Sequence, residues 1–164
     1  MSTRSGDLDP GLAGYLARTE KMSAEQFSVM ANSQSGLLGI SETSADMRDL
    51  LDREARDVRA AEAVALFCYE VKKRIGAFAA ALGGVDTLVF AGGIGENAPA
   101  IRARVCDGLG FLRVQLQAER NAKGEGLISR ADSQVAVRVI RTDEEHMIAK
   151  AVCQVLGPRW HKEN

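Results

Sequence analysis

Residues 85–99 read VDTLVFAGGIGENAP, a pattern that predicts a strand, a glycine-rich turn and a helix in succession. The apolar run from Leu88 to Phe90 is typical of a buried strand covered on both faces. Asn97 is a favourable N-cap residue, and Pro99 would lie in the first helical turn, where its missing N–H costs nothing. We therefore expect a strand that delivers the chain directly to the start of a helix.

Three glycines, Gly92, Gly93 and Gly95, lie in the predicted turn. Glycine allows positive φ and lets a ligand approach the backbone closely. The N-terminus of a helix presents unpaired N–H groups and the positive end of its dipole, so the turn is suited to an anion such as a phosphate. It is not a P-loop, because no Gly-Lys-Ser/Thr follows. The same arrangement is also a common structural connection, and that alternative stays open.

The composition is that of a soluble globular protein of one domain's size, with 164 residues, 46% apolar and 26% charged. The net charge of −1 gives no electrostatic attraction to nucleic acid or to an acidic membrane surface. With 5% aromatic residues, the chain offers no platform for stacking bases. We expect neither a nucleic-acid nor a membrane partner. The sequence shows no apolar run of about eighteen residues and no leader, so we expect a cytoplasmic protein.

The cysteines and histidines do not form a recognisable metal or redox site. Cys68, Cys106 and Cys153 are widely spaced in apolar helical contexts, so we interpret them as reduced core thiols. His146 and His161 lack the spacing to cysteines or carboxylates that a closed metal site requires. We assign no role to either histidine.

Periodicity predicts the remaining elements. Apolar residues recur every three or four positions from Val58 to Leu82, a helix of about seven turns that ends at Gly83-Gly84. Alternation from Val135 predicts a half-exposed strand ending at Arg141. The other predicted helices run from Asp9 to Leu16, Ser23 to Met30, Ser44 to Leu51, Ile101 to Leu109, and Thr142 or Asp143 to Leu156. A loop is predicted from Ser33 to Ser44, and a helical turn or loop at 117–123. Candidate strands lie at 111–116 and, as an edge strand, at 127–129. This order predicts an α/β fold with a small, partly parallel sheet, and so few strands suggest that others are missing from this chain.

Four clusters of candidate functional residues fall at element boundaries, where ligands are usually held. The first is Arg4 in a turn of small residues, suited to a bidentate contact with phosphate or carboxylate. Its alternative is an ordinary solvated arginine. The second is Asp46-Met47-Arg48, where Asp46 would accept hydrogen bonds from a sugar hydroxyl or a base, or else cap a helix.

The third cluster is the turn from Gly93 to Asn97, and the fourth contains two adjacent acids, Glu144 and Glu145, after the last strand. Carboxylates at this place would hold Mg²⁺ through water. Acids in a first helical turn also complement the helix dipole, and that alternative stays open.

A dinucleotide site is a competing interpretation of the glycine turn. Gly93 to Ala98 fits the G-x-G-x-x-A variant of the fingerprint. That motif requires an acid about twenty residues further on, at the end of the next strand, to bind the ribose. The candidate strand ends near Val114, and the nearest acid, Glu119, lies beyond it. An NAD-binding module is therefore disfavoured.

Taken together, the segments MSTRSGDLDP, SADMRDL, VFAGGIGENAPAIR and RVIRTDEEHMIAKA resemble the acetate kinase family of the sugar kinase–actin–Hsp70 fold group. They occur in the family's order and close to its spacing, over nearly the whole chain. The resemblance implies the C-terminal part of an actin-like ATPase (ribonuclease H-like) domain, helix-rich with a small mixed sheet. It would cover residues 1–157, with 158–164 as a tail.

The resemblance also implies ATP-dependent, reversible phosphorylation of acetate to acetyl phosphate, with ATP or ADP and Mg²⁺ as cofactors. Phosphoryl transfer depends mainly on positioning and on cations that absorb charge, which an arginine and Mg²⁺ would provide. The implied roles are stabilisation of the phosphoryl group by Arg4, nucleotide contacts by Asp46, Met47 and Arg48, an adenosine-binding turn at Gly93, Ile94, Gly95, Glu96 and Asn97, and Mg²⁺ ligation by Glu144, with Glu145 as a close alternative.

The chain departs from the family in several ways. It resembles about the last two-fifths of a member and lacks the N-terminal domain, the phosphate-binding glycine loop, and the catalytic aspartate, histidine and second arginine. The first strands of the C-terminal domain would also precede Met1, and Ser2 replaces a usual glycine beside Arg4. We therefore expect little acetate kinase activity from this chain alone, and acetate, propionate and butyrate stay open as substrates.

The expected partners are a nucleotide, a short-chain carboxylate or acyl phosphate, and either a second copy of the chain or a separate N-terminal part. The alternative from a different functional class is a catalytically silent interaction module that dimerises through the long helix. An NAD-binding module is the third hypothesis.

Overall fold

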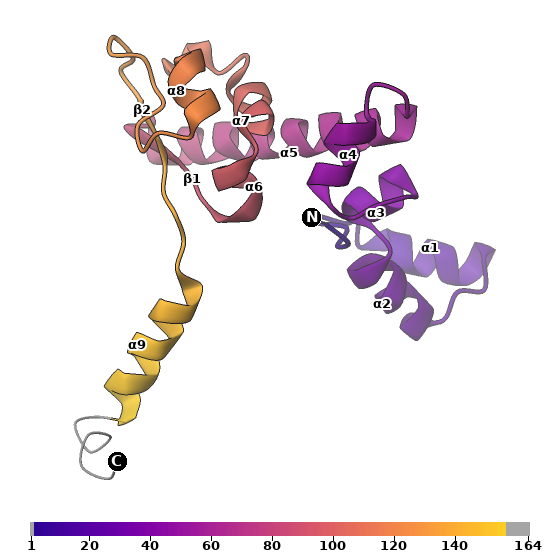
Figure 1. Cartoon of the computed structure of the whole chain (residues 1–164). Coiled ribbons are helices and arrows are strands. Elements are labelled where there is room, and N and C mark those ends of the chain that lie inside the picture. Colours follow the sequence, from indigo (N-terminus) through magenta and orange to yellow (C-terminus); the bar gives the residue numbers. More distant parts are fainter. Residues whose placement is uncertain (1, 157–164) are drawn as a thin grey trace. The chain divides into compact units, whose positions relative to one another are not determined.

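The computed structural model describes residues 2–156 and contains two compact units, Met1–Gly84 and Val85–Asn164 (Figure 1). The predicted tail at 158–164 lies outside the described residues. Within residues 2–156, no helix has both the length and the apolarity that a membrane crossing requires.

The first unit is built around one long helix. Helices α3 and α4 pack against α5, and α1 contacts α2. The buried residues of the unit include Leu37 on α3, Met47 and Leu50 on α4, and Val64 and Cys68 on α5. The helices are α1 (Gly11–Thr19), α2 (Ala24–Ser33), α3 (Gly36–Ser41), α4 (Met47–Arg53) and α5 (Val58–Leu82).

Helix α5 has the predicted bounds because both of its ends are capped. The Asp57 carboxylate accepts hydrogen bonds from the backbone N–H groups at positions 59 and 60, at 3.0 and 3.3 Å. At the other end, Gly83 adopts φ 77°, a left-handed conformation that favours glycine. The apolar periodicity does not translate into burial throughout, since Phe78 and Leu82 are 64% and 79% exposed.

The shorter helices of this unit match the sequence in part. A capping box between Ser23 and Gln26 begins α2, close to the predicted start of this helix at Ser23. The predicted loop from Ser33 to Ser44 is wrong, because α3 forms within it and buries Leu37. Helix α4 begins at Met47 rather than at the predicted Ser44, because Asp46 is its N-cap, and the Ser44 hydroxyl accepts from the Asp46 N–H at 3.0 Å.

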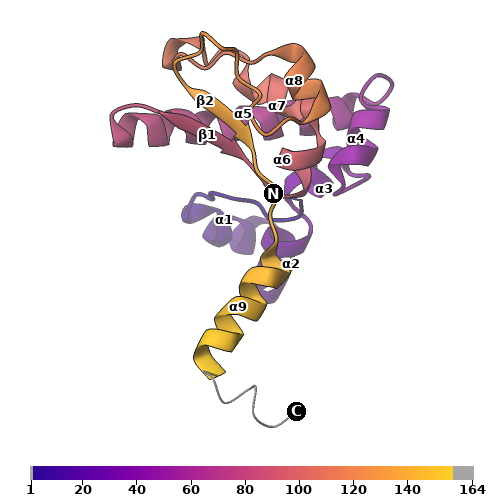
Figure 2. The ribbon, with the colours of Figure 1, turned by 60° about the vertical axis from the view of Figure 1, so that its left-hand side comes forward.

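The second unit contains a two-stranded parallel sheet that pairs Thr87 with Ala136 and Phe90 with Val139 (Figure 2). Isolated antiparallel bridges, Leu116–Ser129 and Leu127–Arg138, make the pairing mixed. Helix α7 contacts α6 and α8, and its buried residues include Ile101 and Val105. The elements are β1 (Thr87–Phe90), α6 (Gly92–Asn97), α7 (Pro99–Cys106), η1 (Gly110–Leu112), α8 (Ala118–Lys123), β2 (Ala136–Val139) and α9 (Glu144–Leu156).

Strand β1 forms where predicted, but it is not covered on both faces. Thr87 and Val89 are exposed while Leu88 and Phe90 are half-buried. The strand has one partner, β2, among the described residues, and the exposed side chains of Thr87 and Val89 leave one of its faces uncovered. The small α/β fold with a partly parallel sheet is confirmed, whereas the full burial of this strand is a wrong prediction.

Other local predictions need correction. Asn97 does not cap α7, because it ends α6, and Ala98 occupies the cap position before Pro99. Residues 111–116 form no strand beyond the single bridge at Leu116, and the 3₁₀ turn η1 takes up their start. Cys153 is exposed on α9 rather than a core thiol, while Cys68 and Cys106 are buried.

Candidate functional site

The glycine turn after β1 is a short helix, α6, and its three glycines have different physical roles. Gly92 adopts φ 71°, as predicted for this turn. Gly93 and Gly95 do not have positive φ, so they do not use the backbone freedom that glycine allows. A Cβ on Gly95 would lie 3.2 Å from the carbonyl carbon of Phe90, whereas one on Gly93 would meet no atom within 4 Å. Gly92 is therefore required for conformation, Gly95 for packing, and Gly93 for neither.

Glu96 links this turn to the segment that follows β2. Its Oε1 atom accepts hydrogen bonds from the backbone N–H of Gly92 at 2.9 Å and of Thr142 at 2.8 Å. The Thr142 hydroxyl donates to the same oxygen at 2.9 Å. These bonds lower the pKa of the Glu96 carboxyl, most strongly through the N–H of Thr142 and next through its hydroxyl. The side chain is therefore held as a carboxylate.

A buried arginine donates hydrogen bonds to the carbonyl groups at the end of α6. Arg102 on α7 is 1% exposed, and its Nη1 donates to the carbonyl oxygens of Gly95 and Glu96 at 2.8 and 2.9 Å. Its Nε and Nη2 donate to the side-chain and backbone oxygens of Asn121 at 2.8 and 2.6 Å. Carbonyls at a helix C-terminus carry partial negative charge, so they offset the burial of the guanidinium. Desolvation by burial lowers the pKa of Arg102.

The acidic cluster begins at the start of α9. The Asp143 carboxylate accepts from the backbone N–H of His146 at 2.9 Å, which confirms it as the helix cap. Glu144 and Glu145 lie in the first turn, and their exposed side chains form no hydrogen bond or ion pair with any residue in 2–156. Both carboxylates are thus available to a ligand.

These carboxylates fit one way of holding Mg²⁺. Mg²⁺ usually keeps several waters and binds through one or two carboxylates together with substrate phosphates. Within the described part of the chain, no group of three or more His, Cys, Asp or Glu side chains could hold a metal ion. Glu144, or its neighbour Glu145, therefore fits a water-rich, phosphate-dependent site rather than a protein cage.

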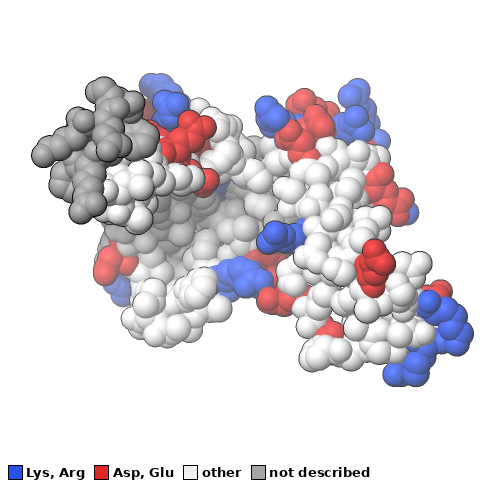
Figure 3. Space-filling view, turned by 90° about the horizontal axis from the view of Figure 1, so that it is seen from below, with Lys and Arg blue, Asp and Glu red and all other residues white. Residues whose placement is uncertain are grey.

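In the first unit, hydrogen bonds hold the backbone on both sides of Arg4, while its side chain has no partner among residues 2–156. The flanking backbone is held by bonds from Ser5 N to Ala31 O and from Ser35 N to Thr3 O, both 2.9 Å. The Arg4 side chain is exposed and pairs with no other residue of 2–156. Figure 3 shows acidic and basic side chains interspersed on the face that it views.

Asp46 and Arg48 form a bidentate ion pair at the start of α4. The guanidinium donates to both Asp46 oxygens, with Nη2 to Oδ2 at 2.6 Å and Nε to Oδ1 at 3.1 Å. The Asp46 Oδ1 also accepts from the Arg48 N–H at 2.9 Å, so the aspartate caps α4. The ion pair and this cap lower the pKa of Asp46 to about 2. Met47 between them is buried, which leaves only its backbone for a ligand contact.

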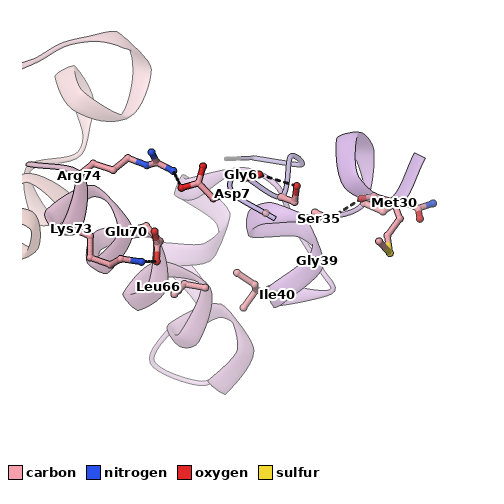
Figure 4. Close-up of a pocket in the computed structure, with 13 residues that line it drawn as sticks. Gly6, Asp7, Met30, Ser35, Gly39, Ile40, Leu66, Glu70, Lys73 and Arg74 are labelled. Carbon is pink, nitrogen blue, oxygen red and sulfur yellow. Dashed lines mark hydrogen bonds and ion pairs between the residues drawn. The ribbon is translucent and has the colours of Figure 1, made fainter. Parts of the chain in front are cut away.

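A surface cavity of about 570 Å³ lies in the first unit (Figure 4). Its lining includes Ser5, the residue that follows Arg4 in the sequence. Figure 4 shows charged residues along one side of it and apolar side chains along the other. Arg74 is paired with Asp7 at 2.9 Å and Lys73 with Glu70 at 2.7 Å. Because these charges are mutually neutralised, the cavity by itself indicates no ligand.

The structure brings together some of the predicted site residues. Gly93 to Asn97 and the segment leading to Glu144 belong to one unit and are joined by Glu96. Arg4 and Asp46 to Arg48 belong to the other unit. Sequence reasoning missed the bonding partner of Glu96 and the role of Arg102, although the A-P-A-I-R pattern after the turn places an arginine within an otherwise apolar helical stripe.

Comparison with known proteins gives consistent results. The sequence profile of the Acetokinase family matches residues 1–150. An acetate kinase of Thermoanaerobacterium thermosaccharolyticum is 51% identical over 154 residues, 92% of this chain and 38% of the relative. One of Symbiobacterium thermophilum is 47% identical over 162 residues, 97% of this chain and 41% of the relative.

Solved structures show the same fold. The crystal structure of Porphyromonas gingivalis acetate kinase matches with a TM-score of 0.86 at 41% identity, covering 96% of this chain and 40% of that one. A propionate kinase from Francisella tularensis gives 0.86 at 36% identity, covering 92% and 39%. The fold is thus the helix-rich C-terminal part of an actin-like ATPase domain. The chain spans about 40% of the length of these relatives.

Proposed function

The chain belongs to the acetokinase family, and we propose that it forms the nucleotide-binding C-terminal part of an ATP-dependent carboxylate kinase. In that reaction a carboxylate oxygen of a short-chain acid such as acetate attacks the γ-phosphorus of ATP. The bond between the γ-phosphorus and the bridging oxygen breaks, and ADP leaves. The reverse direction forms ATP from acetyl phosphate and ADP.

The observation that carries this proposal is the linkage of the glycine turn to the acidic segment through Glu96. One carboxylate oxygen accepts from Gly92 and from Thr142, which lies two residues before Glu144. The turn offers exposed backbone at Gly93 for the adenosine, and the acidic segment offers free carboxylates for a hydrated cation. A nucleotide and its metal ion need these two features close together.

We propose roles in nucleotide and phosphate binding for the other candidate residues as well. Arg4, exposed and unpaired within residues 2–156, would contact the transferring phosphoryl group. Asp46 and Arg48 would contact the nucleotide through their exposed ion pair, and Met47 through its backbone. Mg²⁺, held through water by Glu144 or Glu145, would neutralise phosphate charge.

We propose that this chain binds the nucleotide, and we do not expect it to carry out the complete reaction by itself. The chain spans about 40% of its relatives' length, and the resemblance places the acyl pocket, the phosphate loop and the catalytic aspartate and histidine outside the matched segments. We expect the isolated chain to bind ADP or ATP with Mg²⁺ and to phosphorylate acetate slowly or not at all.

Thermal unfolding without ligand, with Mg-ADP and with NAD tests the proposal. A ligand that binds only the folded state raises the melting temperature. We expect Mg-ADP to raise it and NAD to leave it unchanged. A rise with NAD alone would favour the dinucleotide module, and no rise with either ligand at millimolar concentration would contradict nucleotide binding.

The exposed part of α5 favours a second candidate function, an interaction module. Phe78 and Leu82 are large apolar residues that are exposed at its C-terminal end. The two residues are four positions apart on the helix and so share one face, and a contiguous exposed apolar patch often marks an interface. Light scattering that finds a dimer disrupted by Phe78→Asp would support this function, and a stable monomer would contradict it.

A further inference from the structure

The hydrogen bonds of Glu96 connect two segments that are 46 residues apart in the sequence. Beyond the last residue of β2, Ile140 N donates to Phe90 O at 2.9 Å, and Thr142 donates twice to Glu96. The structure gives no other hydrogen bond from residues 140–145 to a different described element. All described residues of α9 are exposed, so packing does not fix the start of this helix. Glu96 is therefore its principal anchor.

The anchor lies close to the acidic cluster. Glu144 follows Thr142 by two residues, so their Cα atoms lie within about 7 Å of each other. Asp143, between them, is occupied in capping α9. The position of the Glu144 carboxylate relative to the glycine turn thus depends on the Glu96–Thr142 contact.

The same oxygen of Glu96 also controls the start of the turn. It accepts from the N–H of Gly92, the residue whose positive φ begins α6. A ligand that shifts the Gly92–Asn97 backbone would move the Glu96 side chain, and Thr142 would follow. Glu144 or Glu145 would hold a hydrated cation, and a shift of the start of α9 would reach the turn through the same bonds of Glu96.

We propose that Glu96 is a positioning residue that couples nucleotide binding at the glycine turn to divalent-cation binding at the start of α9. This inference rests on the proposed function and adds a regulatory relationship to it. Coupling between two ligands is reciprocal, so Mg²⁺ raises the affinity for ADP by the same factor as ADP raises the affinity for Mg²⁺. Loss of the linkage lowers this factor, while the groups that contact each ligand stay in place.

Calorimetric titration of the whole chain with ADP, in excess Mg²⁺ and in EDTA, measures the coupling factor as the ratio of the two dissociation constants. Thr142→Val removes the hydroxyl donor and keeps the N–H, whereas Thr142→Ser keeps both donors. We expect the factor to fall about tenfold in Thr142→Val, as for loss of a hydrogen bond to a charged group. It should stay near the wild-type value in Thr142→Ser and in the control Glu119→Gln, a surface carboxylate of the same unit.

A second measurement reads the linkage without ligand. In amide NMR spectra of the unliganded chain, Glu96→Gln should shift the Gly92 and Thr142 resonances together. A shift at Gly92 alone would overturn the proposed linkage. An unchanged coupling factor in a folded Thr142→Val would overturn the coupling. Absence of ADP binding by the wild type would overturn the proposed function and the coupling with it, yet joint shifts would still establish the contact.

Discussion

Glu96 and Thr142 are joined by two hydrogen bonds to one carboxylate oxygen, at 2.8 Å from the Thr142 N–H and 2.9 Å from its hydroxyl. The contact fixes the loop after β2 against the turn after β1. Parallel strands place their carboxyl ends at the same edge of a sheet, which is where α/β proteins commonly bind ligands. The glycine turn and the acidic segment meet at that edge, although each follows a different strand.

The first prediction concerns pH. The folded-state pKa of Glu96 is lowered from its ordinary value of 4.5, mainly by the Thr142 N–H. Its contribution to stability is therefore fully present above pH 4.5 and is lost as pH falls through the folded pKa. The groups that face it are Gly92, Thr142 and the charge of Arg141. The melting-temperature difference between wild type and Glu96→Gln should be large at pH 7 and shrink below pH 4.5. A difference independent of pH would contradict this.

The second prediction distinguishes the glycine needed for the backbone conformation of the turn, Gly92, from the one at which a nucleotide would approach the backbone, Gly93. Gly92→Ala should cost about 1–2 kcal/mol of unfolding free energy, because alanine is strained at positive φ. Gly93→Ala should be neutral or slightly stabilising, since its Cβ meets no atom within 4 Å. If the nucleotide approaches this backbone, Gly93→Ala should weaken ADP binding at least about tenfold. Urea unfolding and calorimetry measure the two quantities, and unchanged ADP affinity would exclude a close approach at Gly93.

The third prediction concerns packing of the turn on β1. In Gly95→Val the Cβ would lie 3.2 Å from the Phe90 carbonyl carbon, so the backbone must move. Overpacking of this kind costs about 1–3 kcal/mol. We expect ADP binding to be lost, while Lys73→Ala, on α5, leaves it intact. Wild-type affinity in Gly95→Val would show that the turn does not hold the nucleotide.

The fourth prediction concerns the buried arginine. Arg102→Met removes four hydrogen bonds and leaves the carbonyls of Gly95 and Glu96 without their donor. We expect a loss of at least about 3 kcal/mol in unfolding free energy. The control Arg130→Met breaks only a surface pair with Asp132 and should cost less than about 1 kcal/mol. Equal effects in urea unfolding would contradict the structural role of Arg102.

The fifth prediction concerns Asp46. Its folded-state pKa of about 2 lies below the ordinary 3.8, so its ion pair and cap stabilise the fold above pH 3.8 and are lost as pH falls towards 2. In Arg48→Ala the carboxyl should titrate closer to 3.8, as measured by carboxyl NMR. A titration that stays near pH 2 would mean that the helix cap, rather than the ion pair, holds the charge.

Local signals predicted much of the fold. The bounds of α5 follow from Asp57 and Gly83, which stop the helix by local hydrogen bonding and backbone conformation. The capping box of α2 and the cap at Asp143 are likewise encoded within a few residues. Strand β1 and strand β2 were recognisable from their apolar pattern.

Features that depend on residues far apart in the sequence could not be predicted from local signals. Burial of β1 depends on neighbours on both faces, and α3 forms because Leu37 is buried against other helices rather than because of strong propensity. The Glu96–Thr142 contact spans 46 residues, so no local pattern indicates it. The roles of Arg4, Asp46 and Glu144 were likewise suggested by family resemblance, and they remain proposals.

Isothermal titration of the unmodified chain with ADP in excess Mg²⁺ tests the central claim most directly. We predict saturable binding at one site, weakened by Gly93→Ala and unaffected by Lys73→Ala. Absence of binding heat up to millimolar ADP, from a chain shown to be folded by its cooperative thermal transition, would contradict the assignment of a nucleotide site.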